Sequence, residues 1–188
     1  MLNFDEEKHI YTLDGVEIPS VTTITQMLSN LIYKGVDKEI LQRAAEKGTA
    51  VHKAIEDIEK WGEYNIEPLW QGFVDSYMKA KKELGFKTIQ SELRLHNTNY
   101  AGTVDCIATL GKKTILIDFK TTTTIHNKLV QPQLSAYKIL AENSGFNIDE
   151  LYVLQLTKKG YNFKKIEDDI TIFNKCLELW KYINESKH

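Results

Sequence analysis

Two strongly apolar segments joined by a short turn constrain the fold of this 188-residue chain more than any other feature. Residues 102–110 have the sequence GTVDCIATL and residues 113–120 the sequence KTILIDFK, and Gly111-Lys112 between them predicts a hairpin. Each segment carries one carboxylate among its apolar residues, Asp105 in the first and Asp118 in the second. A carboxylate beside a strand interior is costly unless it is paired or bound to a metal ion. The hairpin therefore predicts a compact site for a divalent cation.

A lysine follows the second carboxylate at a spacing that places both on one side of a strand. Lys120 is two residues beyond Asp118, so both side chains point to the same face and Phe119 points the other way. Hydrolysis of a phosphodiester needs a positioned water, neutralised phosphoryl charge and help for the leaving oxygen, and carboxylate-bound divalent cations supply all three. Asp118 and Lys120 alone also fit an ion pair at a strand end, but Asp105 on the partner strand favours the catalytic interpretation.

Helix and strand signals alternate along the rest of the chain. We expect helices over residues 19–28, 37–45, 49–61, 68–84 and 132–143, with Gly48 interrupting the second and third and Pro132 opening the fifth. The expected strands are 8–13, 16–18, 88–95, 102–110, 113–120, 151–156 and 161–166. A C-terminal helix carries on one face Phe173, Cys176, Leu177, Trp180 and Ile183. The helix, three strands, helix, strand order from residue 68 to 157 predicts an α/β fold with a mixed sheet, and we expect one domain over 1–188.

Composition narrows the classes of protein that the chain fits. The net charge of −2 argues against a protein that holds nucleic acid mainly by bulk electrostatics. Two cysteines, Cys106 and Cys176, cannot form a structural zinc site or an iron–sulfur cluster of the four-cysteine kind, so we expect no iron–sulfur cluster and two plain buried thiols. The N-terminus lacks the features of a signal peptide and no run approaches a membrane span, so the expectation is a cytoplasmic protein with no membrane partner.

Two further motifs accompany the hairpin. Upstream lies Gly48-Thr49-Ala50-Val51-His52, and downstream lies Gln133-Leu134-Ser135-Ala136-Tyr137, whose first and last members are one helical turn apart. His52 borders the apolar stripe of its helix, a position that fits a core-border residue as well as a ligand. With these motifs, residues 19 to 157 resemble the PD-(D/E)XK nuclease superfamily, in particular its RecB-like branch of phage recombination exonucleases and CRISPR-associated exonucleases. The usual proline before the first acidic position is absent, and Thr103-Val104 stands there.

The resemblance implies a restriction-endonuclease-like core and a role for each matched position. Asp105, Asp118 and His52 would hold Mg²⁺ or Mn²⁺, with the Phe119 carbonyl as a further ligand, and Lys120 would act on the water and the transition-state charge. Substrate contacts would come from Gln133, Tyr137 and Thr121. Glu92, on the preceding strand, is either an additional acidic member of the site or a surface glutamate.

The expected function is that of a metal-dependent deoxyribonuclease, an exonuclease of phage or prophage origin in recombination or DNA processing. A structure- or sequence-specific endonuclease stays open, as does a catalytically inactive binding or assembly module with the same fold. The intact set His52, Asp105, Asp118 and Lys120 argues against the inactive module. DNA is the expected partner. The resemblance also implies a single-strand annealing or recombinase protein as a further partner, and a homo-oligomer as the assembly.

Overall fold

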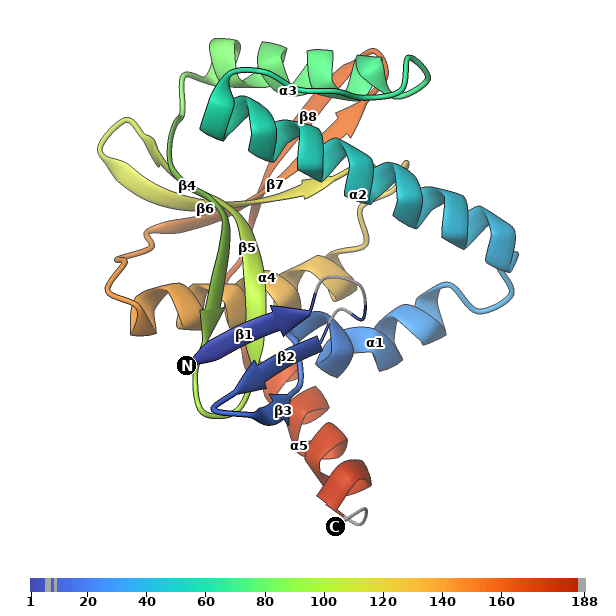
Figure 1. Cartoon of the computed structure of the whole chain (residues 1–188), viewed down its shortest axis with the longest axis vertical. Helices are drawn as coiled ribbons and strands as arrows, with labels where there is room; N and C mark the ends of the chain where they lie inside the picture. The colour runs from blue at the N-terminus through green and yellow to red at the C-terminus, as the bar shows by residue number, and fades with distance from the viewer. Residues whose placement is uncertain (6–7, 9, 186–188) are drawn as a thin grey trace.

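A five-stranded mixed sheet forms the centre of the computed structural model, which describes residues 1–5, 8 and 10–185 (Figure 1). Its strands stand in the order β4-β5-β6-β7-β8, with β6 and β7 parallel and the other neighbours antiparallel. Their bounds are β4 Lys87–His96, β5 Ala101–Leu110, β6 Lys113–Lys120, β7 Glu150–Thr157 and β8 Gly160–Ile166. Helix α3 (Gln71–Leu84) precedes β4, and α4 (Asn127–Asn143) makes the crossover between β6 and β7. The predicted order of helix, three strands, helix and strand is confirmed.

A second, three-stranded antiparallel sheet lies at the N-terminus. It contains β1 (Leu2–Asp5), β2 (Ile10–Leu13) and β3 (Val16–Ile18), and the predicted hairpin turns at Asp14-Gly15, where both residues have positive φ. Strand β1 was not predicted, whereas β2 and β3 were found through the Asp14-Gly15 turn that joins them. The Ala101 amide donates to the Pro19 carbonyl at 2.9 Å, which ties this sheet to the start of β5.

The helix boundaries differ from the expectation at several places: α1 (Val21–Ile32) runs four residues further than expected, α3 begins three residues later, and α2 and α4 differ most. Helix α2 runs without a break over Lys38–Trp61 and contains Gly48, which costs a helix about 1 kcal/mol and does not end it when the flanking turns pack. Helix α4 begins at Asn127 and holds Pro132 in its interior, because the preceding turn is itself buried through Leu129 and Val130. The ends of α2 are as expected, with an Asp37 cap and a left-handed Gly62.

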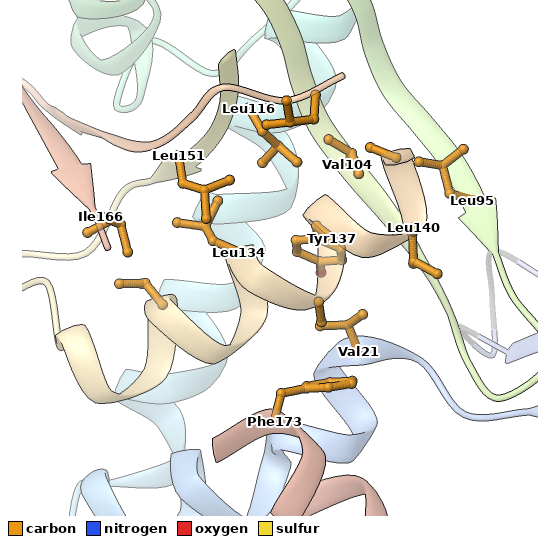
Figure 2. Packing of buried hydrophobic residues seen from close by; sticks show 14 of the residues in the cluster. Val21, Leu95, Val104, Leu116, Leu134, Tyr137, Leu140, Leu151, Ile166 and Phe173 are labelled. Carbon is orange, nitrogen blue, oxygen red and sulfur yellow. The ribbon is translucent and has the colours of Figure 1, made fainter. Parts of the chain in front are cut away.

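The central sheet separates two apolar clusters. One packs β5, β6 and β7 against α1 (Val21–Ile32), α4 and α5 (Thr171–Glu185), and Figure 2 shows its residues around Leu134 and Tyr137. The other packs the opposite face against α2 and α3, which lie side by side in Figure 1. Both cysteines are buried, as expected. Among the described residues, no helix combines the length and apolarity that a bilayer crossing requires.

Candidate metal centre

The site lies where β5 and β6 part. Their ladder ends at the pair Cys106 and Ile117, and beyond it β6 continues only along β7. Asp105 is the first residue past that end, and its Oδ2 accepts the Phe119 amide hydrogen at 2.7 Å. The Asp105 carboxylate thus pairs with the Phe119 amide, which no longer has a backbone partner on β5. This hydrogen bond explains how a strand of apolar residues accommodates a carboxylate.

Three ligand atoms from three elements converge at this opening. The Nδ1 atom of His52, on α2, lies 3.5 Å from Glu92 Oε1 of β4 and 3.5 Å from Asp105 Oδ1 of β5. One ligand atom of each side chain lies within 4.8 Å of the other two. These separations are long for direct hydrogen bonds and suit donors that share one cation bound at about 2.0–2.2 Å.

Glu92 belongs to this cluster, although its place was left open by the sequence. It falls opposite Asp105 between the pairs Ser91–Cys106 and Leu93–Val104. Its φ is +50°, in the left-handed region that costs a non-glycine residue about 1–2 kcal/mol. Strain in mid-strand is tolerated where the surroundings fix it, and it concentrates at functional sites. The available sequence signal was an acidic residue on the strand that precedes the hairpin.

Electrostatics favour a cation between the three side chains. Burial lowers the pKa of His52, but the Asp105 and Glu92 carboxylates outweigh it and hold that pKa well above its ordinary value. Burial raises the pKa of Glu92 despite the imidazole beside it. Burial also acts to raise the pKa of Asp105, but His52, Lys120 and the Phe119 amide bring it below its ordinary value. The Asp105 and Glu92 side chains therefore stabilise positive charge at this position.

The Phe119 carbonyl, the expected further metal ligand, lies beside the His52 ring. His52 Nε2 lies 3.0 Å from this oxygen, and the ring therefore donates a hydrogen bond to it while Nδ1 faces the carboxylates. Such a hydrogen bond fixes the tautomer and orientation of a metal-binding histidine. The Phe119 carbonyl, near the end of β6, therefore orients the His52 ring.

Buried Asp118 and half-buried Lys120 form an ion pair beside the cluster. The Lys120 ammonium lies 2.9 Å from Asp118 Oδ1 and 2.8 Å from Oδ2, and the two side chains are 26% and 5% exposed. Oδ2 accepts no directed hydrogen bond from the described residues despite the nearby ammonium. Burial and the Asp105 charge raise the pKa of Asp118 more than Lys120 lowers it. Asp118 is outside the three-ligand cluster, and its unsatisfied oxygen is a further available ligand.

The remaining predicted residues line two different cavities or none. Tyr137 lines a cavity of about 490 Å³ together with His52, Glu92 and Asp105. Gln133 lines a second cavity of about 180 Å³ with Lys120, and its amide lies 3.3 Å from Thr25 Oγ1 of α1. Thr121 is only 6% exposed. Gln133 and Tyr137, which were expected to share one face of the helix, therefore line two separate cavities.

Of the two motif glycines, Gly102 makes room for a neighbouring motif residue and Gly48 does not. A Cβ at position 102 would lie 2.6 Å from Cε1 of Tyr137, so the bare backbone of Gly102 admits the phenol ring, which Figure 2 shows within the core cluster. A Cβ at Gly48 would lie 3.8 Å from the Thr121 hydroxyl, an ordinary contact. The glycine of the hairpin motif and the tyrosine of the helix motif are thus one packing unit.

Comparison with known proteins finds likeness in structure only. No family model and no curated protein matches the chain. An alkaline exonuclease from Laribacter hongkongensis superposes with a TM-score of 0.48 at 12% identity, covering 67% of this chain and 73% of that one. A phage-related exonuclease from Haemophilus somnus 129PT gives a TM-score of 0.39 at 10% identity, covering 86% and 88%. Both TM-scores are below 0.5, and the assignment of a function therefore depends on the geometry of the site.

Proposed function

We propose that this chain is a divalent-metal-dependent deoxyribonuclease of the RecB-like, PD-(D/E)XK type, acting as an exonuclease. The observation that carries the proposal is the convergence of His52, Glu92 and Asp105 within 4.8 Å, facing a cavity and beside the ion pair of Lys120 and Asp118. Carboxylates, an imidazole and a lysine are the groups that this hydrolysis uses.

The donor set fits a hard or borderline cation. Two carboxylate oxygens suit Mg²⁺ and Mn²⁺ alike, and the imidazole nitrogen shifts the preference towards Mn²⁺. His52, Glu92 and Asp105 would hold the ion, and Asp118, which lies outside this cluster, would be a further ligand. When bound, the ion would polarise the phosphoryl oxygens and lower the pKa of a coordinated water.

The protein's own groups divide the remaining work. The Phe119 carbonyl holds the His52 ring in the tautomer that presents Nδ1 to the cluster. Burial lowers the pKa of Lys120, but Asp118 and Asp105 outweigh it and raise that pKa, so the ammonium stays charged and can orient water and stabilise charge on the phosphoryl group. Tyr137, in the wall of the same cavity, would contact DNA, and Gln133 would act from the other side of Lys120.

The experiment uses end-labelled linear DNA and covalently closed circular DNA of the same sequence, each with Mn²⁺, Mg²⁺ or EDTA. We expect label release from linear DNA with either ion, faster with Mn²⁺, and none in EDTA. Cleavage of the closed circle would assign an endonuclease instead. Binding to both DNAs without cleavage under any ion would assign the inactive module and refute the proposal.

A further inference from the structure

The ring of Phe119 points away from Asp118 and Lys120, and the chemistry proposed for the site uses only the Phe119 backbone. The Phe119 amide donates to Asp105 Oδ2 at 2.7 Å, and its carbonyl lies 3.0 Å from His52 Nε2. The Phe119 side chain belongs to the apolar cluster that packs α2 and α3 on the sheet, and it is 1% exposed. The residue whose backbone contacts two candidate metal ligands is therefore fixed in the core by its ring.

Three rings form an aromatic column, Tyr77–Phe119–His52, that runs from α3 to the candidate metal ligand on α2. The Tyr77 and Phe119 rings are edge-to-face, with centroids 5.4 Å apart and planes at 72°. The Phe119 ring and the His52 imidazole are edge-to-face as well, at 5.9 Å and 74°. Pairs of this geometry are favourable beyond the area that they bury. The His52 imidazole is thus held by the Phe119 ring in addition to the Phe119 carbonyl.

The far end of the aromatic column is anchored by an ion pair. The Tyr77 hydroxyl donates to Glu59 Oε1 at 2.6 Å, and the Lys81 ammonium lies 2.5 Å from each oxygen of the same carboxylate. Tyr77 is fully buried, and the Glu59 side chain is 7% exposed. Tyr77 is therefore held at both its hydroxyl and its ring, so the Phe119 ring packs against a fixed surface.

We propose that the Phe119 side chain is a positioning residue for metal binding, which holds the His52 imidazole in place and thereby sets the preference of the site for Mn²⁺ over Mg²⁺. The inference rests on the metal site of the proposed nuclease and adds a determinant of its metal selectivity. A histidine binds a metal ion through one ring nitrogen, so removing a partner that fixes the ring weakens metal affinity. Mg²⁺ takes mainly oxygen ligands, whereas a nitrogen ligand matters more to Mn²⁺. Loss of the Phe119 ring should therefore act mainly on Mn²⁺.

The test compares Phe119→Leu with Phe86→Leu by calorimetric titration of the DNA-free protein with Mn²⁺ and with Mg²⁺. Phe86 is the matched control, because it is 2% exposed in the same apolar cluster and its ring contact among the described residues is also with Tyr77, at 6.3 Å and 60°. Phe119→Leu should weaken Mn²⁺ binding about fivefold, the size of one aromatic pair, and Mg²⁺ binding less than twofold. Phe86→Leu should leave both affinities within twofold. Both variants should lower the unfolding midpoint, because each deletes part of a buried ring, so a loss of stability alone does not produce the difference.

Phe119→Met and Phe86→Met are the second pair to titrate if a leucine variant does not fold, since methionine adapts to irregular space in a core. Equal Mn²⁺ affinity in the two members of a pair would overturn the positioning role, and so would a Phe119 variant that loses Mn²⁺ and Mg²⁺ affinity equally. Failure of the nuclease proposal looks different. Wild-type protein that binds Mn²⁺ without cutting DNA would refute the nuclease and leave the titrations to decide the role of Phe119, whereas wild-type protein that binds neither ion would refute both.

Discussion

Replacing Gly102 by alanine tests the packing that brings the hairpin motif and the helix motif together. Gly102 has an ordinary backbone conformation for a strand, so the substitution costs nothing in φ and acts only through its added methyl group. That methyl would stand 2.6 Å from Tyr137 Cε1 and 3.3 Å from Val21 Cγ2. Tyr137 is 7% exposed, so its ring has little room to yield. Overpacking of this kind costs about 1–3 kcal/mol, and we expect a loss of about 2 kcal/mol in the free energy of unfolding.

Thermal and urea unfolding measure the effect. For a chain of this length, a loss of about 2 kcal/mol lowers the unfolding midpoint by about 4–8 °C. Gly48→Ala is the matched control, because its methyl meets nothing closer than 3.8 Å. Alanine is the better helix former by about 1 kcal/mol, so Gly48→Ala should raise the midpoint. In a Tyr137→Ala background, Gly102→Ala should cost less than about 1 kcal/mol, because the obstructing atom is gone. An unchanged midpoint in Gly102→Ala, or the same cost with and without the Tyr137 ring, would refute the packing argument.

Three further substitutions test two residues of the candidate site and the ion pair between Glu59 of α2 and Lys81 of α3. His52→Ala should lose at least about tenfold in Mn²⁺ affinity by calorimetry, and unchanged binding would return His52 to a packing role. Tyr137→Phe keeps the ring and removes one hydroxyl, so it should slow DNA cleavage about tenfold without changing the unfolding midpoint; a wild-type rate would make Tyr137 purely structural. Lys81→Met removes the ammonium that pairs with Glu59, whose side chain is 7% exposed, and should lower the free energy of unfolding by about 2 kcal/mol. Lys53→Met, at an exposed ion pair, is the control and should lower it by less than about 0.5 kcal/mol. Burial raises the pKa of Glu59, but Lys81 and Tyr77 outweigh it and bring that pKa below its ordinary value. The stability that the ion pair contributes is therefore present above about pH 4.3 and is lost as the pH falls through the lowered pKa. A difference in stability between the wild type and Lys81→Met that grows on acidification would contradict this pH dependence.

The central fold was predictable because its signals are local. The turns at Gly111-Lys112 and Asp14-Gly15 and the helix end at Gly85 involve residues adjacent in sequence. The errors arose where tertiary packing overrides local preference. Gly48 lies within a continuous helix because the next turn is anchored by buried Val51, and Pro132 lies within α4 because the residues before it are buried too.

The site was predictable as a set of residues and less so as an arrangement. Asp105 and His52 are brought together as expected, but Glu92 joins them only through the β4–β5 register and its unusual backbone. The pairing of Asp118 with Lys120 depends on side-chain rotamers, which spacing along a strand does not specify. That the Tyr137 ring packs on Gly102 is a contact 35 residues apart that no local pattern encodes.

The central claim is that DNA cleavage requires a cation held at the Asp105 carboxylate. The most direct measurement is the rate of label release from end-labelled DNA across a Mn²⁺ titration, for the wild-type protein and for Asp105→Asn side by side. Loss of several kcal/mol of charge stabilisation corresponds to a rate lower by at least about a hundredfold, at an unfolding midpoint close to that of the wild type. We expect a saturating, EDTA-sensitive rate for the wild type and that loss in the variant. Wild-type cleavage that persists in EDTA, or Asp105→Asn protein that cuts at the wild-type rate, would contradict the account.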